Sequence, residues 1–245
     1  MKNIILTTVA VAALTSSAFA AQTGQTYLKG GLGYGLSNAK SSKTTAIKET
    51  NGKKPRGFSG VIGAGYMLND MLGVEGFVDY TSADAKNKEY VGANAEKLKN
   101  KFTESNIGLG GKVFVQHALA EKISVNAGLG AGVAFKSAKQ KFSKTTPGSA
   151  GAADTTTSVE LQSKNITQPF GLVSLGADYT VSEGVAVGLE YAVKFNGKKD
   201  YKTKKDYSAN ASDADLTADD VKKDKPFAKT SKVNQAIMAT VKFAL

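Results

Sequence analysis

The stretch VAVGLEYAVKF, from Val185 to Phe195, alternates bulky apolar residues with small or charged ones. One set is Val185, Val187, Leu189, Tyr191, Val193 and Phe195, and the other is Ala186, Gly188, Glu190, Ala192 and Lys194. Because successive side chains of a β-strand point to opposite faces, this pattern predicts a strand with one apolar and one polar face. Glu190 lies on the polar face, where its carboxylate needs water or a cation as a partner.

The same division recurs in seven further segments, at residues 27–36, 58–67, 72–81, 105–116, 123–136, 169–180 and 232–245. Three short connectors, around 69–70, 117–122 and 182–184, alternate with four long ones, at 37–57, 82–103, 137–165 and 196–231. The long connectors hold 24 of the 32 basic residues. Loops of this length are unusual in a compact soluble domain, but they are normal on the outer side of a membrane barrel whose other side has tight turns.

The alternation alone does not decide which face meets water, since a soluble lipocalin-like barrel also alternates, with its apolar face inside. Three features favour an apolar face against lipid. That face carries no charged residue, the opposite face is rich in Gly, Ala and Ser, and the aromatic residues gather near the two strand ends. The loop-end aromatics are Tyr34, Phe58, Tyr80, Phe135 and Phe195, the turn-end aromatics are Tyr66, Tyr179 and Phe243, and Tyr191 falls between them.

The sequence therefore predicts an all-β protein, an eight-stranded antiparallel up-and-down transmembrane β-barrel with short periplasmic turns and four long extracellular loops. An extra hairpin within 196–231, giving ten strands, stays open. A narrow barrel of eight strands is filled by side chains, and we expect a lumen charge network whose pairing the sequence leaves undetermined. Its members are Lys29, Glu75, Asp79, Lys112, Lys136, Asp178, Glu190, Lys194 and Lys242. Phe170 and Leu172 depart from the pattern, because they fall on the lumen side.

The first twenty residues have the pattern of a secretory signal peptide. Lys2 precedes an apolar run too short to span a bilayer as a helix, and Ala18-Phe19-Ala20 is a small-x-small cleavage signal. We expect residues 1–20 to be removed and residues 21–245 to form one barrel domain. The chain contains no cysteine, which excludes a disulfide-stapled scaffold.

Few residues suit catalysis or metal binding. The single histidine, His117, falls in a predicted short turn, and we interpret it as a solvated turn residue. Glu75 and Asp79 could act as paired carboxylates, but packing in the lumen is the favoured interpretation. The glycine-rich segments 30–35 and 108–112 do not open a helix after a strand, so they are not phosphate loops. We expect no enzyme activity, no cofactor and no metal.

The segments YLKGGLGYG, GFSGVIGAGYML, LGVEGFVDY, VAVGLEYAVKF and the closing VKFAL resemble the small outer-membrane β-barrel family of OmpA/OmpX-type and opacity-type proteins, in the style of rickettsia-like surface antigens. The resemblance covers nearly all of residues 21–245. It implies a bacterial outer-membrane location with loops at the cell surface, and in some members a role as an adhesin. Such barrels usually end on an aromatic residue that the assembly machinery recognises, whereas this chain ends on Leu245.

The basic loops are the candidate partner-binding segments. The residues are Lys40, Lys43, Lys48, Lys53, Lys54 and Arg56 in the first loop, and Lys198, Lys199, Tyr201, Lys202, Lys204, Lys205 and Tyr207 in the last. Expected partners are outer-membrane lipid and lipopolysaccharide, host cell-surface proteins or sulfated glycans, and the assembly machinery through the C-terminal strand. We expect a monomer that binds no nucleic acid. The alternative is a structural or weakly conducting porin-like barrel without a host ligand.

Overall fold

The structure is a computed structural model that describes residues 23–41, 55–91, 96–148, 153–197, 199–202, 209–210 and 226–245. The predicted signal peptide lies outside these residues. The described strands are β1 (Thr26–Ser37), β2 (Lys40–Ser41), β3 (Arg56–Met67), β4 (Leu72–Val91), β5 (Glu96–Ala120), β6 (Ile123–Thr146), β7 (Thr155–Gln162), β8 (Ile166–Ser182), β9 (Val185–Asn196), β10 (Asp200–Lys202), β11 (Ala209–Asn210), β12 (Pro226–Lys229) and β13 (Val233–Ala244). Within them, no helix is long and apolar enough to cross a membrane.

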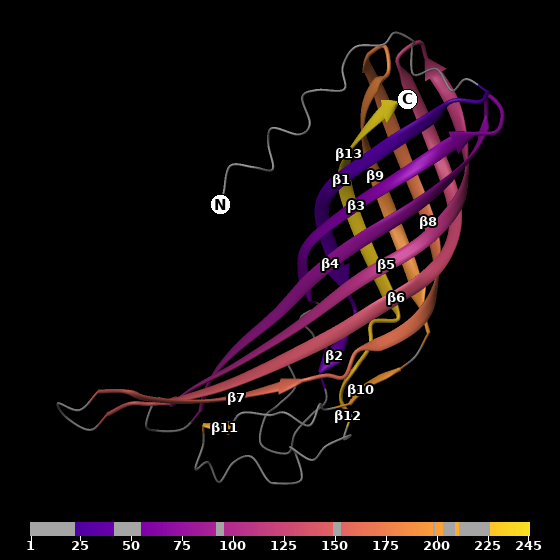
Figure 1. Ribbon diagram of the computed structural model, residues 1–245. Coiled ribbons are helices and arrows are strands. Elements are labelled where there is room, and N and C mark those ends of the chain that lie inside the picture. Colours follow the sequence, from indigo (N-terminus) through magenta and orange to yellow (C-terminus); the bar gives the residue numbers. More distant parts are fainter. Residues whose placement is uncertain are drawn as a thin grey trace.

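Eight of these strands form a closed antiparallel barrel, in the order β1, β3, β4, β5, β6, β8, β9 and β13 (Figure 1). The first and last strands pair over eleven positions, from Tyr27 opposite Ala244 to Ser37 opposite Asn234. The pairing of β6 with β8 completes the ring. The eight-stranded barrel predicted from the alternation is confirmed.

Tight turns connect the strands at one end of the barrel. Asn69 accepts hydrogen bonds at Oδ1 from the backbone N–H groups of Met71 (2.9 Å) and Leu72 (2.7 Å), which is the Asx geometry that favours Asn in turns. Between β8 and β9, Gly184 has a φ of 77°, a conformation that few residues other than glycine adopt. His117 is exposed, as expected, but it lies on β5 opposite Val125 rather than in a turn.

The barrel is inverted relative to a soluble protein, with its bulky apolar side chains outside. Ile62, Leu129 and Leu189 are 74%, 69% and 60% exposed. Lys29, Glu75 and Glu190 are instead buried in the lumen. A water-soluble barrel would bury the first group and expose the second, so hydrocarbon is the solvent that fits the outer wall.

Three strands run well beyond the predicted barrel, which corrects the expectation that residues 82–103 and 137–165 are irregular loops. β4 and β5 stay paired as far as Val91 opposite Glu96, and β6 pairs with β5 and then with β7 as far as Thr146 opposite Thr155. We call this part of β4, β5, β6 and β7 the extended sheet. Figure 1 shows it leaving the barrel at the end opposite the C-terminus.

A second, small sheet forms from the segments predicted as the first and last loops. It has the order β10, β12, β2 and lies at the same end of the molecule as the extended sheet (Figure 1). We call it the cap. The extra hairpin left open by the sequence therefore exists as β10 and β12, but it stands outside the barrel wall.

Gly33 and Gly76 differ in how much space the neighbouring strands leave for a side chain. A Cβ added to Gly33 would lie 1.9 Å from the backbone oxygen of Ile237 on the neighbouring strand, whereas one added to Gly76 would meet nothing within 4 Å. We therefore expect Gly33→Ala to destabilise the folded barrel by about 2–3 kcal/mol and Gly76→Ala to change its stability by less than about 0.5 kcal/mol. Urea unfolding in phosphatidylcholine vesicles, followed by circular dichroism, measures both. Equal effects of the two substitutions would contradict this packing.

Candidate functional site

The lumen holds a neutral quartet of two lysines and two glutamates. Lys29 of β1 binds Glu75 of β4 and lies 3.1 Å (Nζ to Oε2) from Glu190 of β9. Lys112 of β5 lies 2.9 Å from Glu190 and 3.3 Å from Glu75. The Tyr27 hydroxyl donates to Glu75 at 2.8 Å. Glu190 thus has two cations as partners, which accounts for a carboxylate in a strand of otherwise apolar and small residues.

Two further ion pairs lie in the lumen. Lys194 binds Asp79, and its Nζ is 4.6 Å from the centroid of the Phe170 ring. Lys242 lies 2.6 Å from Asp178, which also accepts a hydrogen bond from the Asn126 amide at 2.8 Å. The lumen therefore contains matched charges from six strands.

Lys136 occupies a different place from the other lumen cations. Its Nζ donates to the backbone oxygen of Ser231 at 3.4 Å, close to the cap. The apolar residues on the lumen side, Phe170 and Leu172, pack with Phe77, Ala192 and neighbouring residues in one buried cluster.

Little open space remains among these side chains. The cavity that touches Lys29, Glu75, Asp79, Lys112, Glu190 and Lys194 has a volume of about 30 Å³, which is room for roughly two water molecules. At this level the described side chains leave no room for a channel of ionic width.

The cap is attached to the end of the lumen opposite the C-terminus through Glu104 of β5. Oε1 of Glu104 accepts hydrogen bonds from the Tyr201 hydroxyl (2.7 Å) and the Ser231 backbone N–H (3.3 Å). Its other oxygen accepts from the Ser37 hydroxyl. Burial, and then the charge of Glu104, raise the pKa of Tyr201, so this hydroxyl stays a donor. Tyr201 packs in a buried cluster with Ala39, Ala85, Phe102, Ala138, Leu161, Ile166 and Ala228.

The predicted loop residues are only partly described. Arg56, Lys199 and Lys202 are exposed, and Lys40 is placed by its backbone in β2. Tyr201 is 0% exposed, so the expectation of a surface tyrosine is wrong for this position. The others, Lys43, Lys48, Lys53, Lys54, Lys198, Lys204, Lys205 and Tyr207, lie outside the described residues.

No catalytic arrangement emerges among the described side chains. Glu75 and Asp79 are each paired with lysines rather than with one another. In the described part of the chain, no group of three His, Cys, Asp or Glu side chains is placed to hold a metal ion.

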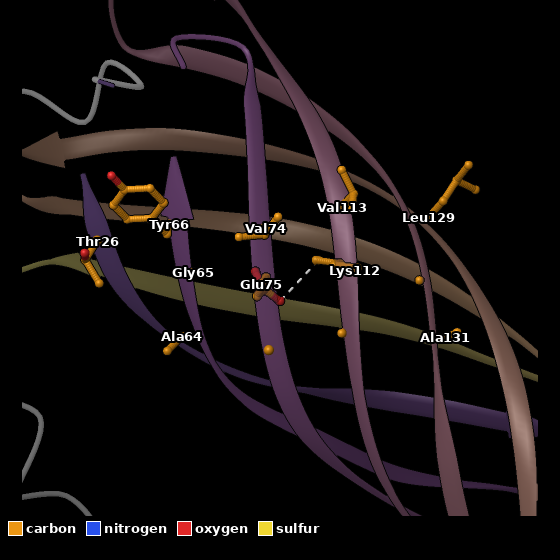
Figure 2. Close-up of a pocket in the computed structure, with 13 residues that line it drawn as sticks. Thr26, Ala64, Gly65, Tyr66, Val74, Glu75, Lys112, Val113, Leu129 and Ala131 are labelled. Atoms are coloured by element: carbon orange, nitrogen blue, oxygen red, sulfur yellow. Dashed lines mark ion pairs between the residues drawn. The ribbon is translucent and has the colours of Figure 1, made fainter. Parts of the chain in front are cut away.

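A shallow groove of about 840 Å³ crosses the outer wall over β3, β4, β5 and β6 (Figure 2). Its floor is a row of small residues that are direct partners on neighbouring strands, namely Ala64, Gly76, Gly111 and Ala131. Exposed Tyr66, Val74, Val113 and Leu129 form the adjacent row along one side of this floor. The charged residues at this level, Glu75 and Lys112, form an ion pair inside the barrel and leave the groove apolar.

The comparisons with known proteins agree with this architecture. The family model for an outer membrane protein beta-barrel domain matches residues 6–217. Putative adhesin RC1281 of Rickettsia conorii is 33% identical over 187 residues, covering 74% of this chain and 72% of that protein.

A solved outer membrane protein has the same fold. The outer membrane protein OprG from Pseudomonas aeruginosa is 12% identical, with a TM-score of 0.52, and the match covers 94% of this chain and 99% of OprG. Ail, the attachment invasion locus protein of Yersinia pestis, is 12% identical with a TM-score of 0.35, over 91% of this chain and 100% of Ail. With eight paired strands, an apolar outer wall and the match to the family model, this chain belongs to the outer membrane β-barrel domain family.

Proposed function

We propose that this outer-membrane barrel is a surface adhesin whose basic extracellular segments bind a host-cell protein or a sulfated glycan. The observation that carries the proposal is the 33% identical relative from Rickettsia conorii, whose name describes an adhesin and whose match spans most of both chains. The first and last loops, with the basic residues predicted above, are the proposed contact segments at the cell surface.

The geometry supports binding at the extracellular end over transport through the barrel. The cavity in the lumen is about 30 Å³, and the quartet of Lys29, Glu75, Lys112 and Glu190 fills the centre. Exposed basic residues such as Arg56, Lys199 and Lys202 are instead placed at the end that carries the cap. This arrangement gives no support to a conducting, porin-like function.

The test replaces residues 203–225 with a four-residue Gly/Ser linker. The replacement also removes β11 and its two residue pairs with β7. Lys202 and Pro226 are paired residues of β10 and β12, so a short hairpin loop can join them without disturbing the cap. Bacteria without adhesins of their own would express the parent or the variant barrel. We expect the variant to lose most of the adhesion to cultured host cells that the parent confers, because Lys204, Lys205 and Tyr207 are removed.

A matched control is Lys122→Gln in the tight turn at the opposite end of the barrel, which should adhere like the parent. Gel mobility before and after boiling shows whether each variant is folded in the membrane. Full adhesion by a folded linker variant would contradict binding through the last loop.

A further inference from the structure

The extended sheet carries five exposed lysines on one face, namely Lys86, Lys99, Lys101, Lys139 and Lys141. We call them the lysine ladder. Lys86 of β4 is the direct partner of Lys101 of β5, which is the direct partner of Lys141 of β6. Adjacent strands are about 4.8 Å apart, so three ammonium-bearing chains start side by side in one row across the sheet.

Such a row is unfavourable without an anionic neighbour, because like charges directly opposite in a sheet repel. Two acids share the face. Asp84 lies 3.1 Å from Lys101 and accepts a hydrogen bond from the Thr103 hydroxyl, while Glu160 lies 3.9 Å from Lys139. Glu160 is also the direct cross-strand partner of Lys141, and Asp84 is close enough to Lys86 to feel its charge, but among the described residues no ion pair forms with Lys86, Lys99 or Lys141. The ladder therefore keeps an excess of positive charge that an anionic partner would stabilise.

The ladder lies on the continuation of the lipid-facing wall. Along β4 the outward positions run from Val78 and Tyr80 to Lys86, and along β6 from Phe135 to Lys141. Lys86 is six residues beyond the aromatic Tyr80, which is about 20 Å along the strand. The extended sheet bends away from the barrel here, so Lys86 lies less than this distance above the aromatic band (Figure 1). The lysine side chains therefore point away from the barrel, toward the space above the surrounding lipid headgroups.

The extended sheet cannot turn over so that the lysine ladder faces the cap. Phe102, Ala138 and Leu161 lie on that face, and they are buried against Tyr201 and Ala228 of the cap. A period of two residues separates the faces, so turning the lysines inward would expose this cluster to water. The cap fixes the orientation in which the lysines point away from the barrel axis.

We propose that the lysine ladder binds the phosphate groups of lipopolysaccharide in the surrounding outer leaflet. The phosphates of a lipid-anchored saccharide lie beside the barrel just above the aromatic band, which is where the ladder faces. Lysine is a compact point charge with three donors, suited to phosphates that present no fixed geometry. This site uses lysines of the second and third connectors. The last loop contacts the extended sheet through the pairing of β11 with β7, but it contributes no residue to the lysine ladder, so the proposal does not rest on the adhesin function.

The experiment titrates the refolded barrel, in zwitterionic detergent micelles, with rough-type lipopolysaccharide that retains its phosphates. The variant is Lys86→Gln/Lys101→Gln/Lys141→Gln. Since a lysine near an anionic membrane surface contributes about fivefold in affinity, we expect the apparent dissociation constant to rise at least tenfold. Added salt should weaken binding of lipopolysaccharide by the parent, so that its apparent dissociation constant approaches that of the variant.

Three comparisons make the result specific. The variant Lys122→Gln/Lys229→Gln/Lys232→Gln removes the same charge from exposed positions off the ladder and should bind within about threefold of the parent. Replacing the three ladder residues with Arg should keep affinity, and dephosphorylated lipopolysaccharide should not distinguish parent from variant. Gel mobility before and after boiling confirms that each barrel is folded.

Two outcomes would overturn the proposal. One is an equal loss of affinity in the off-ladder variant, which would mean that net charge alone governs binding. The other is a ladder variant that binds phosphorylated lipopolysaccharide like the parent but loses binding to heparin in solution, which would assign the ladder to a soluble sulfated glycan. Failure of the adhesion test with the last loop would leave both measurements unaffected.

Discussion

Glu190→Ala is expected to lower the free energy of unfolding of the barrel by about 3–5 kcal/mol. Its carboxylate is the acceptor for both Lys29 (3.1 Å) and Lys112 (2.9 Å), and all three side chains are buried. Without it, two lysines share the single carboxylate of Glu75 and the lumen keeps one uncompensated positive charge. Urea unfolding in lipid vesicles, monitored by circular dichroism, measures the difference.

A second substitution separates lost charge balance from lost packing. Adding Lys112→Met to Glu190→Ala leaves the neutral pair of Lys29 and Glu75, and we expect at least half of the lost stability to return. Glu183→Ala removes an exposed acid from a tight turn and serves as the control, with an expected change below about 0.5 kcal/mol. If Glu190→Ala were no more destabilising than this control, the lumen would have to be solvated by water.

The alternation predicts the barrel at single-residue level because the membrane makes the two faces chemically distinct. Leu189 faces out and Glu190 faces in, as the period of two requires. The lumen positions of Phe170 and Leu172 were also visible in the sequence as exceptions to the pattern. The sequence did not show why these two apolar residues face the lumen. Phe170 packs against Phe77, which lies on a strand remote in sequence, with the two ring centroids 6.3 Å apart.

The sequence pattern did not reveal the extended sheet because its polarity is reversed relative to the barrel, with lysines on the outward face and Phe102, Ala138 and Leu161 on the inward one. Beyond the bilayer no hydrocarbon requires bulky residues outside, so the outward positions change from Tyr80 to Lys86 while the hydrogen-bonded pairing continues. Tyr201 was misplaced for a related reason. Among lysines it suggests an exposed binding residue, but its partner Glu104 lies 97 positions away, and no local signal indicates that pairing.

Glu104→Ala is expected to release the cap from the mouth of the barrel while the barrel itself stays folded. The substitution removes the buried carboxylate to which the Tyr201 hydroxyl, the Ser37 hydroxyl and the Ser231 N–H donate. Each unsatisfied buried donor costs about 1–3 kcal/mol, so local opening of the cap becomes the less costly state. We expect amide hydrogen exchange in β10 and β12 to become about 100-fold faster, with β1 and β9 unchanged.

Hydrogen–deuterium exchange measured by mass spectrometry on the refolded barrel resolves these peptides separately. Tyr201→Phe removes only one of the three groups that donate to Glu104. Its ring still packs with Phe102 and Ile166, so its effect should be much smaller. Glu160→Ala is the matched acid control, since its contact with Lys139 is 3.9 Å and half-exposed. Unchanged exchange in β10 and β12 after Glu104→Ala would mean that apolar packing of Tyr201 and Ala228, rather than the carboxylate, holds the cap on the barrel.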